Sequence, residues 1–323
     1  MLIKGAQTLS VADYQLVEGA THRFIVEFNT ALGENAGWRD LVRMVEQART
    51  YMDPRTGKLT ILWSESDPEM QRDDGEVIFE ALKMRGIELV TDQYVKGFSE
   101  TLPRLRLPAV RETVAEHVRG MGQAVEISQG RMVWRILVVG DTTQHGLCYD
   151  NQPFFHTDHP GKNSFGQVIS QSNLFDGMPL NADNLETVIQ RMITYRTADG
   201  RKVGNRWDSG QDKPSFILHH GAALSKTARK LATKNELDPN IFAGTFIPRL
   251  VDSLEGPYAE HWYPQFIHDD AKPVAMVDEG AVLIPTIGAD TEPGRRHNRA
   301  EWIARAGWGM TYDKWHCMAK CRP

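Results

Sequence analysis

One apolar stripe in the middle of the chain constrains the fold most. Apolar residues recur there at steps of three and four positions, as on one face of an α-helix: Leu107, Val110, Val114, Val118, Met121 and Val125. Pro108 suits the first turn of a helix, where its missing N–H costs no hydrogen bond. A second apolar run at 132–139 could continue the helix to about 30 residues, or roughly 45 Å. The pattern predicts a helix over 107–128 that extends toward 139, weakened by about 1 kcal/mol each at Gly120 and Gly122.

The segment before this helix reads as extended chain. Residues 53–57 form a turn signal, and the tract 64–75 is strongly polar. Alternating apolar residues mark two extended stretches, with Leu59, Ile61 and Trp63 in the first and Ile87, Leu89 and Tyr94 in the second. This pattern predicts a long two-stranded excursion, a kind of loop that is uncommon in compact domains and usually functional.

The rest of the chain mixes helices and strands without a regular βαβ order. In the N-terminal region Phe24 and Phe28 lie one helical turn apart, and Trp38, Val42 and Val45 continue a helical spacing. Residues 140–182 are rich in glycine and proline and read as loops. Asp183 with Glu186 predicts a capped helix start, and the buried face of that helix would be Leu185, Val188, Ile189 and Met192.

The C-terminal half completes an α+β pattern. Residues 215–218 read as a buried strand after Pro214, and residues 222–231 read as a helix after Gly221. Near the end, apolar residues alternate on one side of a predicted strand: Trp302, Ala304, Ala306, Trp308 and Met310.

Charge, hydropathy and cysteines narrow the function classes. The net charge of −5 argues against a dedicated nucleic-acid binder, whose basic residues should dominate its domain. No stretch approaches the ~20 apolar residues of a membrane-spanning helix, and the N-terminus lacks the apolar run of a signal peptide. Cys148, Cys317 and Cys321 are an odd set, which indicates reduced thiols in a cytosolic setting. With only His316 close to Cys317 and Cys321, a zinc site lacks ligands.

Two histidines in one loop are the first candidates for chemistry. His156 and His159 flank Asp158, and two histidines with a carboxylate could bind a metal ion. Pro160 follows at once, so the two histidines do not share a helix face. A structural role in a turn is the favoured interpretation. A metal-dependent enzyme using His156, Asp158 and His159 is the alternative.

The other polar patterns are weaker. His219 and His220 follow an apolar strand and could include a general base, but no nucleophile with a recognisable elbow lies near them. Residues 140–143 lack the full phosphate-loop pattern, and the basic run 295–299 is more typical of a solvated loop than of a DNA contact. No acid, base, nucleophile and oxyanion donor come together. We therefore predict no catalytic, cofactor-binding or metal-binding residue, and no enzyme activity.

The segment 148–160 carries a family resemblance. Its sequence, Cys-Tyr-Asp-Asn-Gln-Pro-Phe-Phe-His-Thr-Asp-His-Pro, is very similar to a signature of the major head subunits of Mu-like tailed bacteriophages, Cys-Tyr-Asp-Gly-x-x-Phe-Phe-Asp-Thr-Asp-His-Pro. This chain has Asn151 where glycine is usual, and asparagine tolerates a left-handed backbone better than most residues. It has His156 where aspartate is usual, which weakens a ligand role for His156 further.

A second similar run follows at the expected distance. Residues 180–185, Leu-Asn-Ala-Asp-Asn-Leu, precede an amphipathic helix, and 199–202, Asp-Gly-Arg-Lys, follow it. The family has a closely similar Leu-Asn-x-x-Asn-Leu, helix and Gly-Arg-Lys order. The next strand and helix also match. Looser similarities reach Phe24 and Phe28 at one end and 262–274 at the other, so the resemblance covers nearly the whole chain and is strongest at 148–202.

This resemblance implies an α+β fold of the Hong Kong 97 capsid type with five parts. They are an N-terminal arm (1–53), an extended loop (54–106), a peripheral domain with a long spine helix (107–180), an axial domain (181–280) and a return to the peripheral domain (281–323). The excursion and the long helix after it follow from the residues alone, and their order agrees with this architecture. The implied function is that of a major capsid protein, structural and not catalytic.

The implied partners are copies of the same chain, in the hexamers and pentamers of an icosahedral head. The resemblance also implies a portal, a separate scaffold protein and a place for decoration proteins, with double-stranded DNA enclosed without sequence-specific binding and no membrane. Family-like features start by Phe24, so we expect no large N-terminal cleavage. The expected location is the virion, after assembly in the host bacterial cytoplasm. A shell of the same fold in a nanocompartment or a gene-transfer particle is a further alternative.

Overall fold

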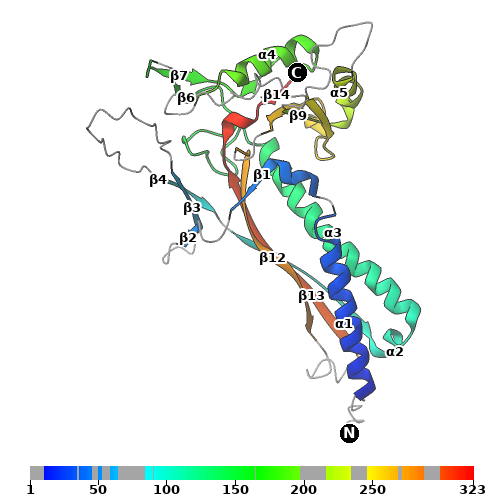
Figure 1. Cartoon of the computed structure of the whole chain (residues 1–323). Coiled ribbons are helices and arrows are strands. Elements are labelled where there is room, and N and C mark those ends of the chain that lie inside the picture. Colours follow the sequence, from blue (N-terminus) through cyan, green and yellow to red (C-terminus); the bar gives the residue numbers. More distant parts are fainter. Residues whose placement is uncertain are drawn as a thin grey trace, which may run out of the picture. The chain divides into compact units, whose positions relative to one another are not determined.

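The computed structural model of the chain describes residues 11–34, 36–45, 50–52, 59–64, 84–89, 91–163, 165–196, 216–233, 246–267, 271–286 and 299–323. The helices are α1 (Val11–Ala31), α2 (Leu102–Leu105), α3 (Pro108–Val138), α4 (Ala182–Ile193) and α5 (Ser225–Ala232), with short 3₁₀ helices at Ala36–Leu41, Ala222–Leu224, Gly256–Tyr258 and Trp315–Cys317 (Figure 1). None of the described helices is long and apolar enough to cross a membrane.

The strands in the described part of the chain form four sheets. One has the order β1-β12-β13-β5, from Val42–Met44, Val274–Thr286, Arg299–Tyr312 and Asp92–Thr101. A five-stranded sheet has the order β10-β9-β11-β14-β8, from Phe246–Leu250, Phe216–His220, Trp262–Phe266, Lys320–Cys321 and Leu174–Phe175. The two smaller sheets are β2-β3-β4 (Thr50–Met52, Leu59–Ser64, Met84–Leu89) and β6-β7 (His159–Lys162, Val168–Gln171). The fold is therefore α+β, as the sequence predicts.

The chain divides into two compact units. Unit 1 consists of Met1–Arg39, Thr91–Met132 and Val277–Gly309, and unit 2 of Asp40–Val90, Val133–Met276 and Met310–Pro323. Four of the described elements contribute residues to both units: α3, β12, β13 and the 3₁₀ helix Ala36–Leu41. These units group residues 133–180 with 181–276, so they divide the chain at points other than the domain boundaries that the resemblance implies.

The long helix predicted from the apolar stripe is α3, with 31 residues. Its stripe packs into the core of unit 1 through Val114, Val118 and Met121. Leu107 lies just before the helix and is exposed, so its assignment to the buried stripe was wrong. The predicted continuation toward residue 139 is confirmed, since α3 ends at Val138.

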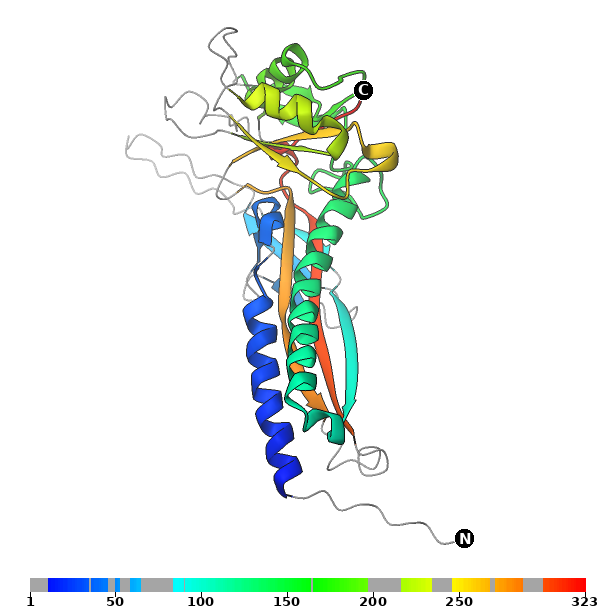
Figure 2. The same ribbon diagram turned by 90° about the vertical axis from the view of Figure 1, so that its right-hand side faces the viewer.

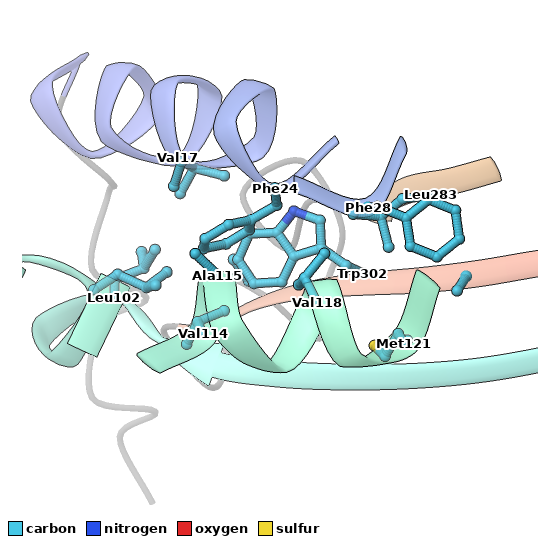
Figure 3. Packing of buried hydrophobic residues seen from close by; sticks show 14 residues of the cluster. Val17, Phe24, Phe28, Leu102, Val114, Ala115, Val118, Met121, Leu283 and Trp302 are labelled. Atoms are coloured by element: carbon cyan, nitrogen blue, oxygen red, sulfur yellow. The ribbon is translucent and has the colours of Figure 1, made fainter. Parts of the chain in front are cut away.

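The core of unit 1 surrounds one tryptophan of β13. Trp302 is fully buried, its ring lies 5.3 Å from that of Phe24 and 5.0 Å from that of Phe98, and its indole N–H donates to Thr21 Oγ1 at 3.0 Å. Figure 3 shows side chains of α1, α3 and β13 meeting there. Phe28 is also fully buried, which confirms the predicted N-terminal helical pair. Within unit 1, α1 and α3 lie side by side (Figure 2).

The predicted excursion before α3 is only partly correct. Strands β3 and β4 pair antiparallel with Leu59 opposite Leu89 and Ile61 opposite Ile87, so the two extended stretches do pair. A third strand, β2, adds to β3. Tyr94 lies in β5, which pairs with β13 in another sheet, so it is not part of the excursion. The polar tract from residue 65 to 75 lies outside the described residues.

Two other local predictions were wrong. Trp38 lies in a 3₁₀ helix and Val42 begins strand β1, so the helical spacing does not continue there. The cap of α4 is Asn181, whose side chain accepts a hydrogen bond from the backbone N–H of Asn184, whereas Asp183 lies inside the first turn. The predicted buried face of α4 is confirmed. Along β13, the alternation from Trp302 to Trp308 is confirmed, while Met310 is half-buried.

Candidate functional site

The loop 148–160 begins with a tight turn in unit 2. The backbone N–H of Asn151 donates to the Cys148 carbonyl at 2.9 Å, and that of Cys148 donates to the Gln152 carbonyl at 2.7 Å. Asp150 Oδ1 accepts from the Gln152 backbone N–H at 3.2 Å. Asn151 has a φ of 63° and is the one non-glycine residue with positive φ in the described part of the chain. Asparagine accepts this left-handed conformation more readily than most residues, which confirms the expectation for Asn151.

Two phenylalanines then anchor the loop beside the end of α3. Phe154 and Phe155 are fully buried, with their rings 4.8 Å apart, and Phe154 stacks on Tyr312 at 5.1 Å. The Phe155 N–H donates to the Gly140 carbonyl at 2.9 Å. A Cβ on Gly140 would come within 3.0 Å of the Phe155 ring. The loop packs so closely here that a residue larger than glycine would crowd this ring. The Tyr312 hydroxyl donates to the Ile136 carbonyl of α3 at 2.9 Å.

His159 is fully engaged inside the protein. Its Nδ1 lies 2.6 Å from Asp150 Oδ2, its Nε2 lies 3.1 Å from Asn173 Oδ1, and its ring stacks on Trp315 at 4.1 Å. His156 Nδ1 accepts from the Asp158 backbone N–H at 3.2 Å. A metal ligand needs a free lone pair pointing into a shared site, and both ring nitrogens of His159 already have protein partners. This geometry supports the structural interpretation of the loop.

A buried asparagine that sequence reasoning missed connects this loop to the C-terminal segment. The Asn173 side chain is inaccessible to solvent, and its Nδ2 lies within hydrogen-bond distance of the carbonyls of Phe154, Trp315 and Met318 at 2.8, 3.1 and 3.2 Å. Its Oδ1 accepts from the His156 backbone N–H at 2.9 Å as well as from His159. These contacts fix the orientation of the amide, so Asn173 Oδ1 is an acceptor and His159 Nε2 is a donor.

A buried lysine, also missed, joins the same segment to α3. Lys320 Nζ donates to the Val138 carbonyl at 2.7 Å and to Asp141 Oδ1 at 2.8 Å. A cation at the C-terminal end of a helix is favourable, because the last carbonyls carry partial negative charge. Burial lowers the pKa of Lys320, and the hydrogen bond to Asp141 opposes this change. Arg322 bridges Asp141 and Asp176 beside it.

The other histidine pair lies on β9, within the five-stranded sheet. His219 is fully buried, and its Nε2 lies 2.8 Å from Gln265 Oε1. Burial lowers the pKa of His219 to about 3, so its ring is neutral near neutral pH. His220 Nδ1 bonds the Gly221 carbonyl at 2.9 Å. A general base must reach a substrate, and His219 lies instead between strands and the Trp134 ring.

The three cysteines are buried thiols. Burial raises the pKa of Cys148, Cys317 and Cys321. Cys148 Sγ donates to the Asp313 carbonyl at 3.3 Å. Across the described ranges, no group of three or more histidine, cysteine, aspartate or glutamate residues could hold a metal ion. The basic run 295–298 lies outside the described residues.

Comparison with known proteins gives both a family match and a fold match. Residues 63–179 match the model of the Mu-like prophage major head subunit gpT, a range that contains α3 and the loop 148–160. Comparison with curated proteins gave no match.

Solved structures resemble nearly the whole chain. One is titled as the procapsid of bacteriophage JBD30, with a TM-score of 0.53, 15% identity, and coverage of 97% of this chain and 75% of that one. A structure from Mycobacterium phage Patience has a TM-score of 0.51, 12% identity, and coverage of 100% and 93%. The mature capsid of bacteriophage PhiM1 gives 0.50, 9% identity, and coverage of 89% and 87%. The fold is therefore the Hong Kong 97-type fold of phage capsid proteins, and together with the family match it supports a structural role as a major capsid protein.

Proposed function

We propose that this chain, a major capsid protein by its family match and fold, assembles with copies of itself into the icosahedral head of a tailed double-stranded DNA bacteriophage. The observation that carries the proposal is the head-subunit match over residues 63–179, within a chain whose fold matches capsid structures along nearly its full length. The buried His159, with protein partners on both ring nitrogens, agrees with a structural role. We propose no catalytic, cofactor-binding or metal-binding residue.

The roles of the chain's parts belong to the same proposal. In it, residues 1–53 form the N-terminal arm, 54–106 the extended loop, and the rest the peripheral and axial domains. The peripheral domain with the spine helix would comprise residues 107–180 and the return at 281–323, and the axial domain would comprise residues 181–280. Axial domains would surround the five-fold and six-fold positions of the shell, where rings close by symmetry.

The proposed partners follow from assembly. They are further copies of the chain in hexamers and pentamers, a portal, a separate scaffold protein and decoration proteins. The net charge of −5 is compatible with a shell that encloses DNA without binding it sequence-specifically. Assembly would take place in the cytoplasm of the host bacterium, and the finished protein would reside in the virion.

Electron microscopy of the expressed protein tests this function. The full chain is produced in bacteria, alone and together with a candidate scaffold protein from the same gene cluster, and purified by size. Closed shells, or hexameric and pentameric capsomers, are the expected result. Soluble monomers under both conditions, at concentrations where related capsid proteins assemble, would refute self-assembly.

The two alternatives give different results. For a metal-dependent enzyme at His156, Asp158 and His159, the purified protein would contain stoichiometric metal, and His159→Ala would lose metal and activity together. For a nanocompartment, shells would form but the neighbouring genes would encode an enzyme cargo. Portal and terminase genes beside this one would favour the phage head.

A further inference from the structure

The hairpin of β6 and β7 carries a solvent-exposed aromatic side chain. The two strands form a sheet of their own in unit 2 (Figure 1). Phe165, in the connecting turn, is 86% exposed, and Val168, at the start of β7, is 75% exposed. They are the two most exposed large apolar side chains among the described residues. Apolar residues gathered at one projecting point are typical of an interaction surface.

The turn that presents Phe165 is ordered by hydrogen bonds around Asn163. Asn163 Oδ1 accepts from the backbone N–H groups of Phe165 and Gln167 at 2.9 and 3.0 Å, and its Nδ2 donates to Gln167 Oε1 at 2.9 Å. The backbone closes the same turn, with Asn163 N–H to the Gln167 carbonyl at 2.9 Å and Gly166 N–H to the Asn163 carbonyl at 3.0 Å. Gly166 has a φ of 75°, which glycine adopts without strain. The tip is thus preorganised, so a partner would not have to order it on binding.

The opposite face of the hairpin is held in unit 2. His159 on β6 and Gln171 on β7 are buried. Gln171 Oε1 accepts from the Arg196 backbone N–H at 2.6 Å, and its Nε2 donates to the Arg196 carbonyl at 2.9 Å. His159 bonds Asp150 and Asn173. The base of the hairpin is therefore fixed, whereas Val168 and Phe165 are exposed.

We propose that this tip, Phe165 with Val168, is a contact between subunits, inserted into an apolar surface of a second copy of this chain. The inference rests on the proposed function, because a shell supplies the second copy. Two side chains bury far less than the ~1,200 Å² of a stable binary interface. A contact this small is effective where many copies are linked and each contact is repeated, as in a closed assembly. Apolar side chains that a second copy would offer include Ile247 and Leu250, which are exposed on opposite faces of the edge strand β10.

Substitutions at the tip test this proposal in assembly of the full chain. Phe165→Ala should raise the concentration at which half of the protein sediments as shells by on the order of tenfold or more, the effect of losing an aromatic anchor. Phe165→Leu keeps an apolar side chain and should assemble close to wild type. Asn163→Ala loosens the turn and should weaken assembly several-fold. Ser170→Ala, at an exposed position of the same hairpin, is the matched control and should change nothing.

Each result is decisive. All four variants should keep the circular dichroism spectrum and melting temperature of the wild type within error, because the substituted side chains contribute little to the core. If the wild type forms shells and Phe165→Ala forms them at the same concentration, the tip contact is wrong while the proposed function stands. If Phe165→Ala assembles normally but loses a decoration protein that the wild type binds, the partner is not a second copy. If the wild type forms neither shells nor capsomers under any condition, both proposals fall.

Discussion

A methyl group added at Gly122 should destabilise unit 1, whereas the same group added two residues earlier, at Gly120, should stabilise it. Both glycines lie inside α3. A Cβ on Gly122 would lie 2.6 Å from the Phe28 carbonyl oxygen and 3.0 Å from Ala31 Cβ, both on α1. A Cβ on Gly120 would meet nothing within 4 Å. The two substitutions therefore change helix propensity equally and differ in the packing of α1 against α3.

The magnitudes follow from these two terms. Glycine to alanine inside an open helix gains about 0.5–1 kcal/mol, because the unfolded chain loses freedom and the helix covers more backbone. At Gly122 the closest contact is a backbone oxygen, which cannot rotate away, so α1 must shift by several tenths of an ångström. Overpacking of this kind costs about 1–3 kcal/mol. We expect Gly120→Ala to stabilise by about 0.5–1 kcal/mol and Gly122→Ala to destabilise by about 0.5–2 kcal/mol.

Urea unfolding of the unassembled subunit measures both values. Trp302 lies in the core that α1 and α3 share, so tryptophan fluorescence reports the loss of this packing. If the slope of the free energy of unfolding against urea concentration is the same in the variants and the wild type, all of them unfold from the same compact state. If Gly122→Ala stabilises as much as Gly120→Ala, the two helices do not approach each other at this glycine, and the account of unit 1 packing is refuted.

Three further outcomes are expected. Asn173→Ala should lower the free energy of unfolding by about 2–4 kcal/mol, because it leaves several buried backbone groups unpaired. The control Asn29→Ala, on the exposed face of α1, should change it by less than about 0.5 kcal/mol. Equal effects in the two variants would contradict this prediction. Burial lowers the pKa of His219 to about 3 in the folded protein, against its ordinary 6.5. The unfolded chain therefore takes up the proton first, and the free energy of unfolding falls as pH drops from 6.5 toward 3. Urea titrations should show a shallower fall for His219→Gln, and an equal fall of the free energy of unfolding with pH in both proteins would argue that the ring is accessible. The three buried thiols should react with a disulfide reagent at least about tenfold more slowly in the folded protein than in urea, and equal rates would place one of them at the surface.

The sequence predicted those parts of the fold that depend on apolar periodicity over many residues. The stripe in α3 spans several turns, so a helical period was the one regular pattern that fitted it. The short run from Trp38 to Val45 shows the limit of this reasoning. Trp38, Val42 and Val45 are all buried, so the pattern predicted burial correctly. A run of only eight residues, however, does not distinguish a helical turn from a 3₁₀ helix that leads into a strand.

The polar contacts of the candidate site could not be predicted in the same way. Asn173 bonds carbonyls 142 and 145 residues away, and Lys320 bonds a carbonyl 182 residues away. Such pairs leave no local spacing in the chain, and a lone asparagine or lysine is ordinarily assigned to the surface. The left-handed turn at Asn151 was expected because the family that the chain resembles has glycine there, and asparagine tolerates that conformation better than most residues.

The histidines of the loop 148–160 show how a pattern that resembles a catalytic or metal site can be distinguished from one. A histidine that works on a substrate or a metal keeps one ring nitrogen directed at an open position, while the other is held by the protein. His159 has Asp150 on one nitrogen, Asn173 on the other and Trp315 against its face. Its bonding capacity is used entirely in joining residues 150 and 173, and Asn173 extends this link to the carbonyls of Trp315 and Met318. The same residue types that suggest chemistry in the sequence therefore serve to tie distant segments of unit 2 together.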